Sequence, residues 1–95
     1  MEFTESKFNG SIIKEQGVTF AIVLVKNSFF NSTSSKIEEY RNSLIPVFGP
    51  IPIIFASQDS RGTFRYHGRK DIVKFLANID PSRIPWKEYT IKLKS

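Results

Sequence analysis

The stretch IPIIFASQDSRGTFRYHGRKDIVKFLANI, residues 51–79, decides the fold that we expect for this chain. Its first six residues, 51–56, form a short apolar run that suits a buried strand. Residues 62–67 alternate between polar and apolar side chains, and the polar loop between the two runs predicts a hairpin. From Arg69 onward the apolar residues recur at helical spacing up to Ile79, which predicts an amphipathic helix. The stretch therefore predicts a hairpin followed by a helix.

The residues before this stretch predict a helix and a central strand. A first helix is expected over residues 5–16, with Gly17 just past its end. Residues 18–25, VTFAIVLV, form the most hydrophobic run of the chain. Because this run is apolar without alternation, it is typical of a central strand that is covered on both faces.

A second helix is expected to begin at Lys36. Ser35 is followed three residues later by Glu38, and this pair fits a capping box at the start of a helix. Pro46 ends this helix because it has no backbone N–H and crowds the preceding turn. The proline-rich segment that follows, residues 45–52, is expected to be irregular and largely extended.

Residues 80–95 are expected to form a C-terminal extension or an edge strand. Pro81 and Pro85 exclude a continuation of the preceding helix. The side chains of residues 89–94 alternate between apolar and polar, which suits a strand. The 95 residues suit a single domain, since no linker is long enough to separate two.

The chain contains no cysteine and a single histidine. Disulfides, thiol redox catalysis and thiolate metal sites are therefore excluded, and so is a site built from several histidines. No constellation of acids and bases suggests a catalytic site. We expect no catalytic residue, no metal site and no cofactor, and hence a protein that is not an enzyme.

The net charge of +5 is unevenly distributed. Residues 1–60 carry five Lys or Arg and six Asp or Glu, whereas residues 61–95 carry nine and three. A basic half can attract nucleic acid, anionic lipid or an acidic partner, and it can equally be a solvated surface. The start of the chain, MEFTESKF, does not resemble a secretory signal, and no apolar run approaches the roughly 20 residues of a membrane span. We therefore expect a cytoplasmic protein without a membrane partner.

Several segments, taken in chain order, form a recognisable set: Phe3-Thr4 with Phe8 and Ile12, AIVLV at 21–25, IPIIF at 51–55, and YHGR at 66–69 leading into IVKFL at 72–76. Together they resemble the thioredoxin-like superfamily, and most closely its protein disulfide isomerase branch. They resemble, in order, the first strand and helix of the family, its central strand, its cis-proline strand, and its terminal hairpin and helix. The resemblance implies a small three-layer α/β domain with a mixed sheet and a C-terminal hairpin–helix unit.

The chain departs from this family in two respects. Residues 32–35, STSS, stand where the family has its Cys-x-x-Cys. A hydroxyl has a far higher pKa than a thiol and forms no disulfide, so redox activity is excluded. The strand–helix unit that the family has before its proline strand is also missing, because only about seven residues separate Leu44 from Pro52. The resemblance therefore implies a trimmed and redox-inactive version of the fold.

The resemblance also implies a site for a protein or peptide partner. In the family, the backbone beside the cis-proline pairs with an extended peptide, so a non-catalytic peptide-binding module is expected. The residues expected to contact this partner are Phe29, Phe30, Ser32, Ser35 and Pro52. This topology requires residues 51–56 to lie antiparallel and adjacent to residues 18–25. It also implies a cis peptide bond before Pro52, which the sequence itself leaves open.

The same elements also fit a ferredoxin-like βαββαβ order with an extra N-terminal helix. In that arrangement residues 18–25 and 51–56 are parallel, and residues 62–67 lie between them. The chain would then be a small nucleic-acid-binding protein. Its expected contacts are Arg61, Arg65, Arg69 and Lys70.

One feature of the second hairpin strand argues against RNA recognition. Phe64 and Tyr66 fall on the strand face that turns into the core, so no platform for stacking bases is expected. His67 is expected to be an exposed strand residue and not a base.

Overall fold

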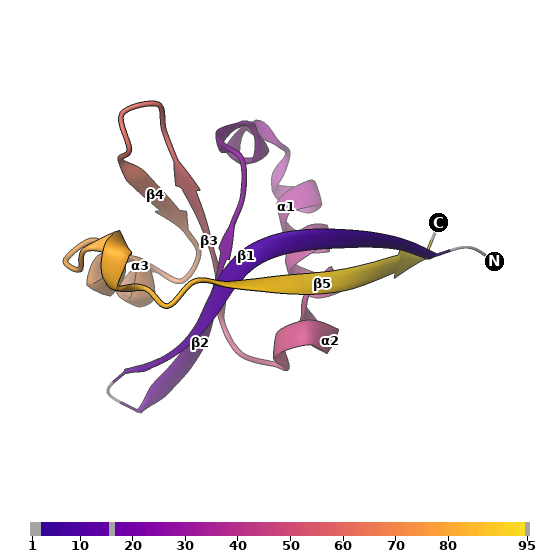
Figure 1. The fold of residues 1–95 in the computed structure, drawn as a ribbon, viewed down its shortest axis with the longest axis horizontal. Helices are drawn as coiled ribbons and strands as arrows, with labels where there is room; N and C mark the ends of the chain where they lie inside the picture. Colours follow the sequence, from indigo (N-terminus) through magenta and orange to yellow (C-terminus); the bar gives the residue numbers. More distant parts are fainter. Residues whose placement is uncertain (1–2, 16, 95) are drawn as a thin grey trace.

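The computed structural model describes residues 3–15 and 17–94, and the side chains of residues 7–15 and 17–90 (Figure 1). Within these residues the chain forms one mixed sheet in the order β4-β3-β2-β1-β5. The strands are β1 (Phe3–Glu15), β2 (Val18–Leu24), β3 (Ile53–Gln58), β4 (Phe64–His67) and β5 (Lys87–Lys94). The helices are α1 (Ser34–Ser43), α2 (Ile45–Phe48) and α3 (Lys70–Leu76), with short 3-10 helices η1 (Asn27–Asn31) and η2 (Pro81–Arg83).

Helices cover both faces of the sheet. Ile37 of α1 and Phe48 of α2 pack on one face, whereas Ile72 and Leu76 of α3 pack on the other. The four residues 20–23 of β2 are all at most 2% exposed, and they alternate between the two clusters. The expectation of a central strand covered on both faces is therefore confirmed, and the three layers form a mixed α/β domain.

The hairpin–helix unit is also confirmed, with shifted boundaries. β3 and β4 pair antiparallel, and α3 follows Gly68. Phe64 and Tyr66 pack against the cluster that contains α3, as their strand phase predicts. Burial raises the pKa of the Tyr66 phenol. Of the two alternatives for the end of the chain, the structure contains the edge strand, because β5 pairs with β1 alone.

The first predicted helix, over residues 5–16, is wrong. Residues 3–15 form β1, which pairs antiparallel with both β2 and β5. The residue Gly10 suits this strand because β1 and β2 approach closely there: a β-carbon at this position would lie 2.7 Å from the carbonyl oxygen of Ile22. Gly17, with a φ of 79°, lies in the turn of the β1–β2 hairpin and does not end a helix. The same glycine signal thus marks a hairpin in this chain.

The pairing of β2 with β3 contradicts both predicted topologies. The two strands are adjacent and parallel, with Ala21 opposite Ile53 and Leu24 opposite Ala56. The thioredoxin-like arrangement requires an antiparallel pair, and the ferredoxin-like order requires β4 between the two strands. Parallel neighbours need a crossover connection, which α1 and α2 provide on one face of the sheet.

The segment after α1 is helical, contrary to the expectation of a largely extended return. Residues Ile45–Phe48 form α2, and Gly49 ends it with a φ of 84°. No extended return is needed, because α1 already carries the chain back to the end of the sheet where β2 begins. Among the described residues no peptide bond is cis, so the bond before Pro52, which the sequence left open and the resemblance implied to be cis, is trans. No helix of the described segments is both long and apolar enough to cross a membrane.

Substitution of Gly10 by alanine distinguishes the strand from the predicted helix. In β1 the new β-carbon meets the Ile22 carbonyl, and we expect a loss of about 1–3 kcal/mol in the free energy of unfolding. In an exposed helix the same change would stabilise by roughly 0.5–1 kcal/mol. Urea denaturation of Gly10→Ala, with Asn9→Ala as the exposed neighbouring control, measures the sign. A gain in stability would contradict the observed pairing of β1 and β2.

Candidate functional site

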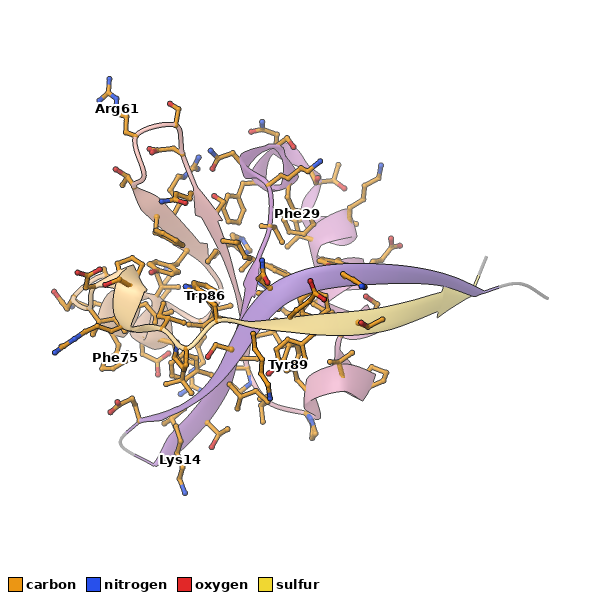
Figure 2. The ribbon with its side chains drawn as sticks, in the orientation of Figure 1. Lys14, Phe29, Arg61, Phe75, Trp86 and Tyr89 are labelled. Carbon is orange, nitrogen blue, oxygen red and sulfur yellow. The ribbon has the colours of Figure 1, made fainter. Side chains whose placement is uncertain are left out.

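A groove of about 810 Å³ lies at the carboxyl end of β2, between β1 and α1. We call it the β1–α1 groove. Three segments line it: Lys7, Phe8 and Asn9 of β1; Leu24, Val25 and Lys26 at and after the end of β2; and the segment from η1 to α1, with Ser28 and Phe29 of η1, Ser32 after η1, and Lys36 and Tyr40 of α1 (Figure 2 labels Phe29). In open α/β sheets, ligands bind outside the carboxyl ends of strands, where neighbouring segments diverge. The β1–α1 groove occupies such a position.

The groove exists because β1 and β2 part at this point. Their last pair is Gly10 with Val23, after which the chain follows β3, since the Val25 amide donates to the Ala56 carbonyl at 2.7 Å. From Gly10 back to Phe3, β1 extends past the end of β2 and stays paired with β5. The space between the two segments is bounded on its far side by η1 and α1.

The floor of the groove is aromatic and firmly packed. The Phe29 ring lies 4.9 Å from the buried Phe55 ring and 5.5 Å from the ring of Tyr40. Tyr40 in turn stacks on Phe55 at 5.6 Å. Burial raises the pKa of the Tyr40 phenol, so this side chain is neutral at physiological pH. The floor is therefore an uncharged aromatic surface, which suits apolar groups of a ligand.

The rim of the groove is basic. Lys7, Lys26 and Lys36 come from three different segments, and among the described side chains, residues 7–15 and 17–90, no Asp or Glu lines the groove. Lys7 has a carboxylate nearby, since its ammonium lies 3.8 Å from Glu88. Both side chains of this pair are about two-thirds exposed, so the pairing is weak and solvent-screened. The arrangement favours a ligand that carries negative charge beside apolar groups.

The start of α1 differs from the predicted capping box. The helix begins at Ser34, and its cap is Thr33, whose side chain accepts a hydrogen bond from the Lys36 amide. Ser35 is an exposed residue of the first turn and does not line the groove. The expected helix is present, but it begins two residues earlier than predicted. This shift places Ser32 and Lys36, not Ser35, at the groove.

The structure does not bring together the five residues expected to bind a partner. Phe29 and Ser32 line the β1–α1 groove, whereas Phe30, Ser35 and Pro52 do not. The Pro52 carbonyl accepts a hydrogen bond from the Ala21 amide at 2.9 Å, before the start of β3. Because β2 and β3 are parallel, Pro52 lies at the opposite end of the sheet from the residues that follow β2.

Phe30 faces β4 instead of the groove. The Arg65 guanidinium lies 5.4 Å above its ring, and the exposed His67 ring lies 6.0 Å away. Arg41 of α1 donates to Nδ1 of His67 at 3.2 Å and to the Ile53 carbonyl at 3.1 Å, and it also pairs with Glu38. Since Arg41 is a donor only, Nδ1 of His67 is the acceptor. These contacts join α1 to β3 and β4.

The four basic residues proposed for nucleic acid extend along the β4 edge of the sheet. Arg61 lies in the exposed turn before β4 (Figure 2), Arg65 on β4, and Arg69 and Lys70 at the start of α3. The Arg69 guanidinium donates twice to Asp71, at 2.8 Å each, and this hydrogen bonding lowers the pKa of the Asp71 carboxyl. Arg69 is therefore already paired within the chain.

Of the groove residues, sequence reasoning found only Phe29 and Ser32, and it missed among others Lys7, Lys26, Lys36 and Tyr40. The charge balance of residues 1–60 hid the three lysines, because acidic residues elsewhere in that half offset them. One signal was available, since Lys26 comes soon after the most apolar run and hence after a central strand. Lys7 carried no such signal, because its segment was assigned to a helix.

Comparison of the chain with protein-family models, with curated proteins and with solved structures finds no match. Within the described residues no group of three or more His, Cys, Asp or Glu is placed to hold a metal ion. The function must therefore be inferred from the chemistry of the groove.

Arg41 should contribute more to stability than Arg65, although each lies over a phenylalanine ring. The Arg41 side chain is only 18% exposed and donates to the Ile53 carbonyl. We expect Arg41→Leu to cost about 1–3 kcal/mol, because this acceptor loses its charged donor. The matched change Arg65→Leu should stay within about 0.5 kcal/mol. Thermal and urea denaturation of both variants compares them, and equal losses would contradict the bridging role of Arg41.

Proposed function

We propose that this chain is a protein-binding module without catalytic activity, which holds a peptide segment of a partner protein in the β1–α1 groove. The observation that carries the proposal is the pairing of an aromatic floor with three lysines at the rim of the groove. Apolar contacts supply affinity in such a site, and charge selects the partner. The preferred partner is therefore an acidic segment with apolar side chains.

The composition of the groove favours binding over catalysis. Ser28, Ser32 and Tyr40 supply its hydroxyl groups, but no histidine or carboxylate is among the described residues that line it. A serine nucleophile needs an adjacent base to accept its proton. The hydroxyls are thus better suited to accept and donate hydrogen bonds to a bound peptide.

This proposal keeps part of the expectation from sequence and moves the site. Peptide binding without redox chemistry is retained, and so are Phe29 and Ser32 as contact residues. Pro52 is replaced by Lys7 and Phe8 of β1, which line the groove. A cytoplasmic location belongs to the same proposal and is compatible with a chain that lacks cysteine.

The groove predicts preference for one of two peptides that share their apolar residues. One peptide carries glutamate at every polar position, and the other carries lysine. We expect the acidic peptide to bind at least about tenfold more tightly at low salt, and the double variant Lys26→Glu/Lys36→Glu to remove this preference. Fluorescence anisotropy of the labelled peptides, at low and at physiological salt, measures both effects.

The matched control is Lys14→Glu/Lys74→Glu. It changes the net charge by the same amount at two exposed residues of β1 and α3 that do not line the groove. The control should retain the preference for the acidic peptide. If both peptides bind equally, or if the control loses affinity as strongly as the groove variant, the site is not the β1–α1 groove.

A second candidate function is nucleic-acid binding along the β4 edge. It is favoured by Arg65, which lies over the Phe30 ring on the exposed side of β4, together with Arg61 in the adjacent turn. In this case, the logarithm of the association constant for a mixed-sequence oligonucleotide falls linearly with the logarithm of the salt concentration. The double variant Arg61→Ala/Arg65→Ala makes this slope less steep by about two. The variant Lys26→Glu/Lys36→Glu provides the comparison, because the first proposal places its ligand there.

A further inference from the structure

We infer that the occupant of the β1–α1 groove binds as an extended acidic strand that adds to the free edge of β1. This inference rests on the proposed function and specifies how the peptide is held. It assigns the backbone of β1, and not only side chains, to recognition. The mode is addition of a β-strand, in which main-chain hydrogen bonds give affinity and side-chain pockets give selectivity.

β1 has a long segment that is paired on one side only. It pairs with β2 from Gly10 to Glu15, but with β5 from Phe3 to Gly10. Within the described ladder, the backbone of residues 3–9 therefore has no strand on the side toward β2. At about 3.4 Å per residue, this edge is roughly 20–25 Å long, which is enough for a bound strand of ordinary length.

The free edge opens directly into the groove. Lys7, Phe8 and Asn9 of this segment are groove residues, and so are Val25 and Lys26, where the chain leaves β1. The Lys26 carbonyl already accepts from the Phe29 amide within η1, so this segment turns away and does not continue as a strand. A peptide strand that lies where β2 would run if it continued past Leu24 therefore occupies the groove.

The surroundings select the chemistry of the added strand. Its side chains alternate between two faces, and one of these faces meets the floor formed by Phe29 and Tyr40. Lys7, Lys26 and Lys36 surround the same space. Apolar residues on the face toward α1 and glutamate or aspartate at the intervening positions satisfy both conditions.

The charge also disfavours a second copy of this chain as the occupant. Lys7 lies on this free edge, and a lysine there is a common means of preventing pairing between identical edges. A second copy carries the same net charge of +5. An acidic strand from another protein is attracted by the groove that repels this copy.

The test uses the whole chain and a synthetic peptide of about eight residues that alternates glutamate with valine or phenylalanine. In a bound strand, successive amides point to opposite edges. Two further peptides are N-methylated at alternate residues, one at the odd positions and the other at the even positions. We expect one of these two to lose at least about tenfold in affinity, while the other stays close to the unmodified peptide. Equal affinities for all three would overturn strand addition and leave peptide binding intact.

Amide hydrogen exchange measured by NMR locates the added strand. In the free protein, alternate amides of residues 3–9 are paired with β5, and the others face the groove. Saturation with the unmodified peptide should protect the second set. Binding with protection only on β5, or without any new protection, would also overturn the inference. If the unmodified peptide does not bind, or if it binds the Lys26→Glu/Lys36→Glu variant as tightly as the unchanged chain, the proposed function fails as well.

Discussion

The parallel pairing of β2 with β3 is the constraint on which the rest of the structure depends. Parallel neighbours run in the same direction, so the chain must return along one face of the sheet before β3 can begin. α1 and α2 make this return and bury Ile37, Leu44 and Phe48 against the sheet. The crossover fixes the start of α1 at the carboxyl end of β2. One wall of the β1–α1 groove is thereby determined by the topology of the sheet.

The opposite wall follows from the position of β1. Because β3 occupies one side of β2, the hairpin places β1 on the other side, and β5 then extends the sheet beyond it. β1 is longer than β2, so its first residues pass the end of β2 and pair with β5 alone. Phe8 anchors this overhang, with its ring 5.6 Å from that of Tyr89 and 6.0 Å from that of Phe48. The groove thus has a strand on one side and a helix on the other.

The sequence predicted the elements whose periodicity is strong and local. β2, the β3–β4 hairpin and α3 follow from apolar runs and alternation within single segments. β1 was missed because Phe8, Ile12 and Ile13 also have helical spacing, and because Gly17 suits a helix end as well as a hairpin turn. Its partner β5 lies at the other end of the chain, so no local signal could reveal the pairing. The groove was missed with it, since β1 forms one wall of the groove.

Pro52 shows why an apparent motif did not locate the site. A proline before an apolar run places the site correctly only if the following strand is antiparallel to β2, because the carboxyl end of β2 then lies beside the start of that strand. The sequence IPIIF carries no information about strand direction; that direction depends on which way α1 returns the chain. With β3 parallel, Pro52 lies beside Ala21 instead, and the residues after β2 acquire β1 as their neighbour. The reversed direction of this strand therefore removes the expected site beside Pro52, and an open strand edge with lysines around it takes its place. Both arrangements present backbone to an extended segment, but only the second places lysines beside that backbone, and the proposed preference for acidic segments depends on these lysines.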